Sequence, residues 1–473
     1  MLKLFVKKFK RKKMKLKGLI GDKAFYKRTL KIAVPIIIQN AVTNLVNLLD
    51  NLMVGSLGTE RMSGVAIVNQ FVFVFNLAVF GAISAAGIFT AQYNGRADEA
   101  GVRYTMRSKL IICTLISILG ITVFLTLGDS LILGFLHDGT EGDLALTLES
   151  GREYLLYLLI GLLPYAVSQA YASTLRETGE TLVPMISSVA SVATNFVFNG
   201  LLIFGLFGFP ELGVVGAAIA TSLSRFAELL ILIIWTHRNK KKCPFIVGVF
   251  RSVYIPRELV RQIVIKGLPI LLNECLWSLS ITMRNQFYST RGLEVVAAIN
   301  IAITLQNLLS VAYMALSNSI GIIIGNLLGA GKIEEARDAD RKLLAFSVFA
   351  GFCMMGIQLA LSPVVPLLYN TTEAARKTAT YLIICFGISM PFAALATSSY
   401  YTIRSGGRVL ITMLFDSFYA WTVVIPIVAA VTHFTDLSIY YLFPISLIAD
   451  NLKLLPGLWL VGKGVWAKQL KIE

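Results

Sequence analysis

The sequence predicts an all-α polytopic membrane protein with twelve transmembrane helices, and its composition is the first observation behind this. Of the 473 residues, 56% are apolar and only 15% are charged, against roughly a quarter charged in soluble globular proteins. Long apolar runs recur along the chain, as helices that need about 20 residues to cross a bilayer require. These runs are too long for the strands of a membrane barrel, and they lack the alternation of apolar and polar residues that such strands show. A soluble enzyme, a disordered chain and a coiled coil are therefore excluded.

The individual helices follow from the apolar runs and from the charged breaks that separate them. Each run is long enough to span the hydrocarbon core, and twelve spans account for all of them. Prolines inside several runs are compatible with this, because transporter helices tolerate kinks. The expected spans are residues 30–57, 64–94, 108–136, 151–174, 181–208, 211–236, 260–289, 294–328, 341–369, 378–402, 409–432 and 437–462.

The charge pattern predicts the orientation in the membrane. Residues 1–31 carry thirteen Lys/Arg and one acid, and residues 237–266 carry eight Lys/Arg and one acid. The loop after the third span is instead acidic, with Asp138, Glu141 and Asp143. Because Lys and Arg mark the cytoplasmic side, both termini and the central linker are expected there. The net charge of +16 is then a topological signal rather than a sign of nucleic-acid binding, and the 1–31 arm is expected to contact anionic headgroups.

An internal repeat divides the chain into two six-helix halves. LKIAVPIIIQN (30–40) matches VIKGLPILLNE (264–274), and LGTE (57–60) matches RGLE (291–294) at the same offset. Two halves that both enter from the cytoplasm are parallel repeats, as in transporters that rock around a central cavity. The expected domains are an arm (1–31), an N-lobe (32–236), a basic linker (237–259), a C-lobe (260–462) and a tail (463–473).

Polar side chains in two N-lobe spans are the first candidates for a functional site. They recur at spacings of three and four, which places them on one helix face. A carboxylate with amide oxygens suits a small cation or a proton-dependent switch, because ionisable groups in lipid are costly unless functional. The alternative is an amide ladder that holds helices together. The residues are Asn40, Asn44, Asn47 and Asp50 in the first span, and Asn195 and Asn199 in the fifth.

Three acids in the C-lobe are further candidates. Glu274 lies within the seventh span, where a coupling-ion role competes with a structural ion pair to Arg284. Asp416 lies near the start of the eleventh span, where functional and structural interpretations stay equally open. Asp450 is followed by Lys453 at a spacing of three, which favours a neutralised pair on one helix.

The chain resembles the multidrug and toxic compound extrusion (MATE) transporters over nearly its whole length after about residue 28. This resemblance implies antiport of organic, often cationic compounds against inward Na⁺ or H⁺. It places the family's cation-coupling residues on Asp50, Asn195, Asn199 and Glu274. Several relatives carry a further aspartate at the position of Ala393, so a C-lobe cation site would need other residues, such as Asp416. The segments that carry the resemblance are AVPIIIQNAVTNLVNLLDNLMVGSLG (33–58), GVVGAAIATSLSR (213–225), LPILLNECLW (268–277) and GNLLGAGKIEEA (325–336).

We therefore expect a cation-coupled exporter in the bacterial cytoplasmic membrane that works as a monomer. It is expected to need no catalytic residue, bound metal or cofactor besides Na⁺ or H⁺, and to bind small organic substrates, membrane lipid and no nucleic acid. Asn47 and Asp416 are possible additional coupling residues. The alternatives are a lipid-linked precursor flippase, which would need a strongly basic cavity, and an intramembrane enzyme. The expected substrate cavity uses Asn40, Asn44, Gln70, Trp277, Tyr313 and Met390.

Overall fold

The computed structural model describes residues 19–135 and 143–470, with the side chains of residues 46–48 left out. The first part of the basic arm, and Asp138 and Glu141 of the acidic loop, lie outside the described residues. Within the described part, every regular element is helical and twelve helical segments are long and apolar enough to cross a membrane. The predicted all-α fold with twelve spans is thus confirmed.

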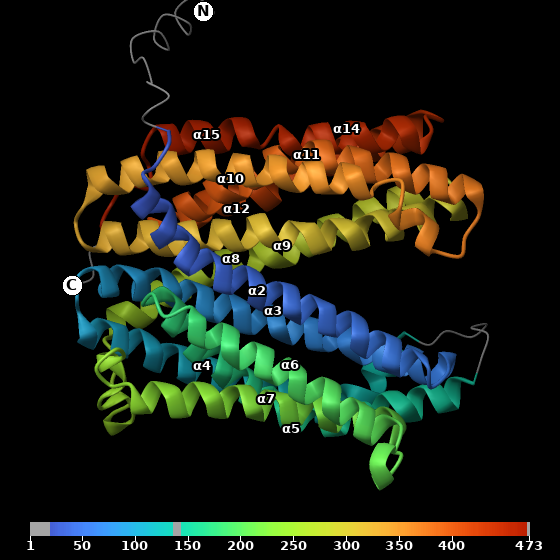
Figure 1. Ribbon diagram of the computed structural model, residues 1–473, viewed down its shortest axis with the longest axis horizontal. Helices are drawn as coiled ribbons and strands as arrows, with labels where there is room; N and C mark the ends of the chain where they lie inside the picture. The colour runs from blue at the N-terminus through green and yellow to red at the C-terminus, as the bar shows by residue number, and fades with distance from the viewer. Residues whose placement is uncertain (1–18, 136–142, 471–473) are drawn as a thin grey trace, which may run out of the picture. The chain divides into compact units, whose positions relative to one another are not determined.

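Each of the twelve spans (Figure 1) overlaps one apolar run of the sequence, with ends that differ by up to nine residues, as where the third span begins at Glu99 instead of residue 108. The last two are interrupted: Val409–Phe434 begins as α12 and ends as α13, and Ile439–Gly462 comprises α14 and α15. The helices are α2 (Lys23–Gly55), α3 (Thr59–Gly95), α4 (Glu99–Leu133), α5 (Leu144–Glu177), α6 (Leu182–Ile203), α7 (Gly213–Arg238), α8 (Arg257–Ser289), α9 (Leu293–Gly329), α10 (Ile333–Leu361), α11 (Glu373–Ser405), α12 (Val409–Met413), α13 (Ile425–Phe434), α14 (Ile439–Asn451) and α15 (Leu454–Gly462).

The repeat is visible in the backbone of the two halves. Helices α2 and α8 each have 33 residues and contain the matched prolines Pro35 and Pro269. Helices α3 and α9 each have 37 residues, and the residue before each is a glycine with positive φ, 112° at Gly58 and 115° at Gly292. A residue with a side chain rarely adopts this conformation, so the same turn requires glycine in both halves.

The chain forms two compact units whose boundaries fall inside helices. Unit 1 contains residues up to Val34 and Leu279–Gln469, and unit 2 contains Pro35–Ser278 and the last four residues. The expected lobes, with boundaries at the arm and the linker, stay a prediction. The start of α2 packs in unit 1, where the rings of Tyr26 and Phe346 are 5.1 Å apart.

Unit 2 contains most of α2, helices α3 to α7 and the first part of α8. Helices α4 and α5 pack against α3, and α5 and α6 pack against α7. Small residues allow the close approaches: a Cβ on Gly216 of α7 would lie 2.3 Å from the carbonyl oxygen of Leu202 in α6. A similar contact joins α3 and α8, where a Cβ on Gly81 would lie 3.3 Å from Leu271. Glycine at such positions is typical of helix packing in membranes.

Unit 1 is organised around α11. This helix packs against α9 and α10, which also contact each other, and it contacts α14 and α15 (Figure 1). Two apolar clusters fill the unit, one around Ile299 and Leu382 and the other around Ile324 and Ile403. Phe25 from the start of α2 packs against the second cluster, together with Trp466, which is 2% exposed.

Candidate functional site

A polar network inside unit 2 joins the predicted residues of α2 and α6. The amide nitrogen of Asn199 donates to the carboxylate of Asp50 and also to Oδ1 of Asn195, at 3.2 Å. The amide of Asn195 in turn donates to Oγ1 of Thr221 in α7, at 3.3 Å. Asn195 and Asn199 are one turn apart on α6 and are 4% and 1% exposed, whereas Asp50 is half-buried. The structure therefore brings three predicted residues together and adds Thr221, which sequence analysis missed.

One oxygen in this network has unused bonding capacity. Oδ1 of Asn199 is buried and accepts no hydrogen bond from any residue that the structure describes. Rotating the amide by half a turn would not help, because its oxygen would then face two other acceptors, the Asp50 carboxylate and Oδ1 of Asn195. A buried polar atom without a partner costs about 1–3 kcal/mol. The site therefore offers a carboxylate and a free amide oxygen side by side to a cation or a proton.

The other polar residues predicted along α2 and α3 are less enclosed. Asn40 and Asn44 are exposed in α2, and Gln70 is exposed in α3. Asn47 lies in α2, but its side chain is outside what the structure describes. Within the described part of the chain, Asn40, Asn44 and Gln70 make no hydrogen bond to Asp50, so the assignment of these four residues to a coupling site or a substrate cavity stays a prediction.

The predicted residues of α8, α9 and α11 lie in different environments. Glu274 in α8 is half-buried within unit 2, and Trp277 one turn later is 36% exposed. Tyr313 and Met390 belong to unit 1 and are 6% and 0% exposed. Lining of a substrate cavity by these aromatic and thioether side chains stays a prediction.

The acids near the end of the chain form an ion cluster in unit 1. Nζ of Lys453 lies 3.0 Å from Asp416 and 3.3 Å from Asp450, and Arg284 lies 3.7 Å from the other oxygen of Asp450. The predicted Asp450–Lys453 pair is thus present. Arg284, expected as a structural partner for Glu274, pairs with Asp450 instead, because Glu274 lies ten residues earlier on the same helix, too far for a side-chain contact. The exposed fractions of the four side chains are between 15% and 25%.

The backbone around Asp416 departs from a regular α-helix. Leu414–Phe418 and Ala420–Val424 are π-helical turns between α12 and α13. Such turns are rare in proteins, and those that occur are often at functional sites. Asp416 lies in the first of these turns and contacts Lys453 of the following span, a contact that the apolar pattern of the eleventh run does not predict.

A second polar chain in unit 2 was missed by the sequence analysis. Glu228 of α7 is 6% exposed and accepts a hydrogen bond from Ser188 of α6, at 2.8 Å. Ser188 accepts one from Gln39 of α2, at 2.8 Å, and Gln39 accepts one from Arg176, at 3.3 Å. An acid inside the predicted span 211–236 was the available signal, but its partners lie far away in sequence.

Two further buried charges were also missed. Lys109 of α4 is fully buried; it pairs with Glu177 and donates to Ser173 at 2.8 Å. Asp340 of α10 is 2% exposed and accepts a hydrogen bond from Thr402 of α11, at 2.6 Å. Both lie close to the charged starts of predicted spans, where a sequence cannot distinguish a buried charge from a hydrated one.

The described residues contain no cluster of three or more His, Cys, Asp or Glu side chains that could hold a metal ion. Coordination at Asp50 would therefore use one carboxylate with amide and hydroxyl oxygens. Such a set is weak for transition metals, which prefer imidazole or thiolate, and is suited to hard cations.

Known proteins resemble this chain over almost its full length. The probable multidrug resistance protein NorM of Thermotoga maritima is 26% identical over 456 residues, which cover 94% of this chain and 93% of the relative. The probable multidrug resistance protein NorM of Bacillus subtilis is 25% identical and covers 88% of this chain and 90% of its own length.

Solved structures share the fold. A crystal structure of MATE in complex with MaD3S has a TM-score of 0.84 and 20% identity, covering 96% of this chain and 98% of its own. A MOP superfamily transporter from Pyrococcus furiosus, whose reversed pocket polarity suggested a different function for that protein, also has a TM-score of 0.84 with 20% identity, covering 97% and 99%. The MatE family model matches residues 35–201 and 269–430, well over half of the sequence. The chain therefore belongs to the MatE family, the multidrug and toxic compound extrusion (MATE) transporters.

Proposed function

We propose that this protein is a secondary active antiporter that exports organic, often cationic and amphiphilic compounds in exchange for inward Na⁺ or H⁺. Members of the family are transporters and not enzymes, so the intramembrane-enzyme alternative is dropped. The relatives' names as multidrug resistance proteins support a broad range of small organic substrates. The twelve apolar helices make the chain a multi-pass membrane protein, and we place it in the bacterial cytoplasmic membrane with both termini inside.

The observation that carries the coupling proposal is the unsatisfied Oδ1 of Asn199 beside Asp50. A Na⁺ ion at this position would be coordinated by the carboxylate and the amide oxygen. Its binding would remove the free-energy cost of leaving these two groups without a cation. A proton on Asp50 would instead give the carboxyl group a hydrogen to donate to Oδ1 of Asn199, once the amide has turned its oxygen toward Asp50. Either cation neutralises the carboxylate and changes the contact between α2 and α6.

Coupling requires that the cation and the organic substrate have different affinities in the two access states. A cation that binds better to one state shifts the protein toward that state only by this difference. Because Asp50 and Asn199 lie on different helices, a cation held between them favours the arrangement in which α2 and α6 are in contact. Glu274 is proposed as a second coupling residue, with Asn47 as a possible contributor.

The ion cluster of unit 1 bears on Asp416 and on the alternative function. Lys453 already occupies the Asp416 carboxylate at 3.0 Å, so a coupling role for Asp416 requires Lys453 to release it. A flippase for pyrophosphate-linked lipids would need basic side chains free to bind phosphate. Arg284 and Lys453 are instead paired with carboxylates, so neither of these two is free to bind phosphate.

Gradient-driven dye efflux from proteoliposomes tests the proposal. We expect Asp50→Asn to reduce ethidium efflux driven by Na⁺ or H⁺ to the level of protein-free vesicles, and Asn199→Leu and Glu274→Gln to reduce it strongly. Asp129→Asn is the matched control, because this carboxylate is 54% exposed in an ion pair with Arg152. Imposing each gradient separately identifies the coupling ion. Full gradient-driven efflux by Asp50→Asn would contradict the proposed site.

A further inference from the structure

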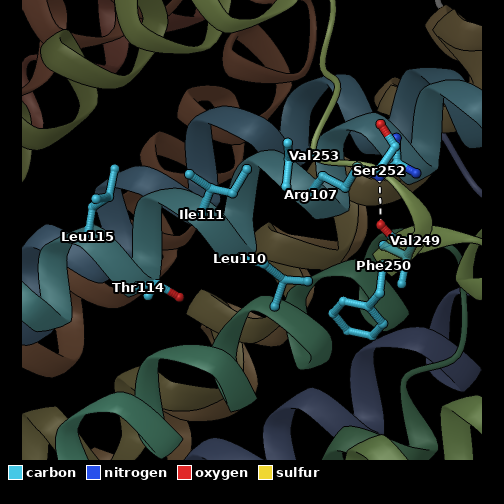
Figure 2. A pocket seen from close by; sticks show the side chains of 9 residues that line it. All are labelled: Arg107, Leu110, Ile111, Thr114, Leu115, Val249, Phe250, Ser252 and Val253. Atoms are coloured by element: carbon cyan, nitrogen blue, oxygen red, sulfur yellow. Dashed lines mark hydrogen bonds between the residues drawn. The ribbon is translucent and has the colours of Figure 1, made fainter.

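A groove lies between α4 and the linker that joins α7 to α8. Its volume is about 300 Å³, and it is open on one side. Figure 2 shows the lining side chains of α4 along one wall and those of the linker along the other. The lining is apolar except for three residues. The residues are Arg107, Leu110, Ile111, Thr114 and Leu115 of α4, and Val249, Phe250, Ser252 and Val253 of the linker.

The open side of the groove continues an apolar surface of a membrane-spanning helix. Ile111 and Leu115 on α4 are 37% and 60% exposed, and in a bilayer such side chains contact hydrocarbon. On the linker wall, Phe250 and Val253 are 69% and 83% exposed. The ring of Phe250 is held in place by stacking on His237 at the end of α7, with centroids 5.9 Å apart. Large exposed apolar side chains on a charged linker indicate contact with a membrane.

Arg107 closes one end of the groove and gives it a positive charge. Its guanidinium donates to the carbonyl oxygens of Val249 and Gly248, both at 2.7 Å, and of Tyr254 at 3.0 Å. An arginine carries five N–H donors, so one on each terminal nitrogen remains available. No carboxylate among the described residues forms an ion pair with Arg107, although the side chain is only 8% exposed.

A buried cation that is held only by carbonyl dipoles favours an anion nearby. The surrounding linker reinforces the same sign, since residues 237–266 contain eight Lys/Arg and one acid. Arg251 stands between Phe250 and Ser252 in the chain and is exposed. The groove therefore combines two features. Its open side continues the lipid-facing surface of a helix, and the end where Arg107 lies carries positive charge.

We propose that this groove is a binding site for an anionic phospholipid. One acyl chain lies along Ile111 and Leu115, and the phosphate group lies at the end of the groove where Arg107 and Arg251 supply charge. The bound lipid would hold the linker against α4, because Arg107 contacts both the phosphate and the linker carbonyls. This site is separate from the Asp50 network and does not depend on the coupling mechanism.

Native mass spectrometry of the full-length protein in a mild detergent tests the proposal. Phosphatidylglycerol and phosphatidylcholine with identical acyl chains are added at equal concentrations. We expect preferential retention of phosphatidylglycerol. Leu115→Trp, which fills part of the groove, should reduce its occupancy about fivefold, which corresponds to about 1 kcal/mol. Leu119→Trp is the control, because Leu119 lies one turn further on α4 and is 65% exposed.

A second pair of variants tests the charge at the mouth of the groove. Ser252→Glu should reduce phosphatidylglycerol binding about fivefold more than Ser252→Gln, which has the same size without the charge. Three results would each overturn the proposal: equal retention of the two lipids, equal binding by Leu115→Trp and Leu119→Trp, or displacement of phosphatidylglycerol by glycerol phosphate at similar concentration. The last would show that an anion binds without its acyl chain.

Discussion

Replacing Lys109 by methionine should destabilise the protein by about 3–5 kcal/mol, the usual cost of removing one partner of a buried ion pair. The Lys109 side chain is fully buried in α4. Its ammonium group pairs with Glu177 and donates to Ser173 at 2.8 Å and to Thr174 at 3.2 Å. Hydrogen bonds to charged groups contribute roughly 1.5–3 kcal/mol each, so the loss of two of these three contacts would already account for an effect of this size.

The carboxylate left behind is the main source of the loss, and a double variant can show this. Glu177→Gln in the Lys109→Met background removes the negative charge that Lys109 no longer balances and keeps an acceptor for Ser173, so part of the lost stability should return. The assay is thermal unfolding in detergent, followed by the monodisperse fraction after heating. Lys332→Met is the control, because its pair with Glu335 is exposed and such pairs contribute about 0–1 kcal/mol. An equal melting temperature for Lys109→Met and Lys332→Met would refute the reasoning.

Two further predictions concern packing and thiol chemistry. Gly216→Ala should lower the melting temperature by several degrees more than Gly356→Ala. A Cβ at Gly216 would lie 2.3 Å from a backbone oxygen of α6, whereas a Cβ at Gly356 would meet open space. Equal melting curves for the two variants would contradict this. Burial raises the pKa of the Cys243 thiol in the linker to about 12. Because the thiolate is the reactive form, maleimide labelling of a chain with Cys243 as its sole cysteine should stay slow between about pH 7 and pH 9, as mass spectrometry would show. Fast labelling whose rate levels off above about pH 8.5, typical of a free thiol with a pKa of about 8.5, would contradict it.

The twelve helices could be predicted because a bilayer imposes length and apolarity on every span. The unit boundaries could not be predicted in the same way. Helices α2 and α8 are continuous through Val34 and Ser278, where the chain passes from one unit to the other. A charged break marks the end of a helix, but no local feature of the sequence marks the point at which its packing partners change.

The candidate site, too, could be predicted only in part. Asp50, Asn195 and Asn199 stand out because each is polar inside an apolar run. The sequence was enough to recognise their chemistry, but not to predict their contacts. Glu228 stands in an equally apolar run, yet the average hydropathy of a span is hardly changed by one acid. Its hydrogen-bond partner Ser188 lies forty residues away, so only the folded structure distinguishes this satisfied carboxyl group from one available to a cation.

The central claim is that Asp50 binds the ion that is exchanged for substrate, and counterflow tests it most directly. An ethidium gradient is imposed across proteoliposomes with no ion gradient, and the movement of Na⁺ and H⁺ is followed with ion-sensitive dyes. Because coupling is reciprocal, we predict that one of these ions moves opposite to ethidium in the wild type, and that Asp50→Asn abolishes this movement. Ethidium flux without ion counterflow, or counterflow that persists in Asp50→Asn, would contradict the claim.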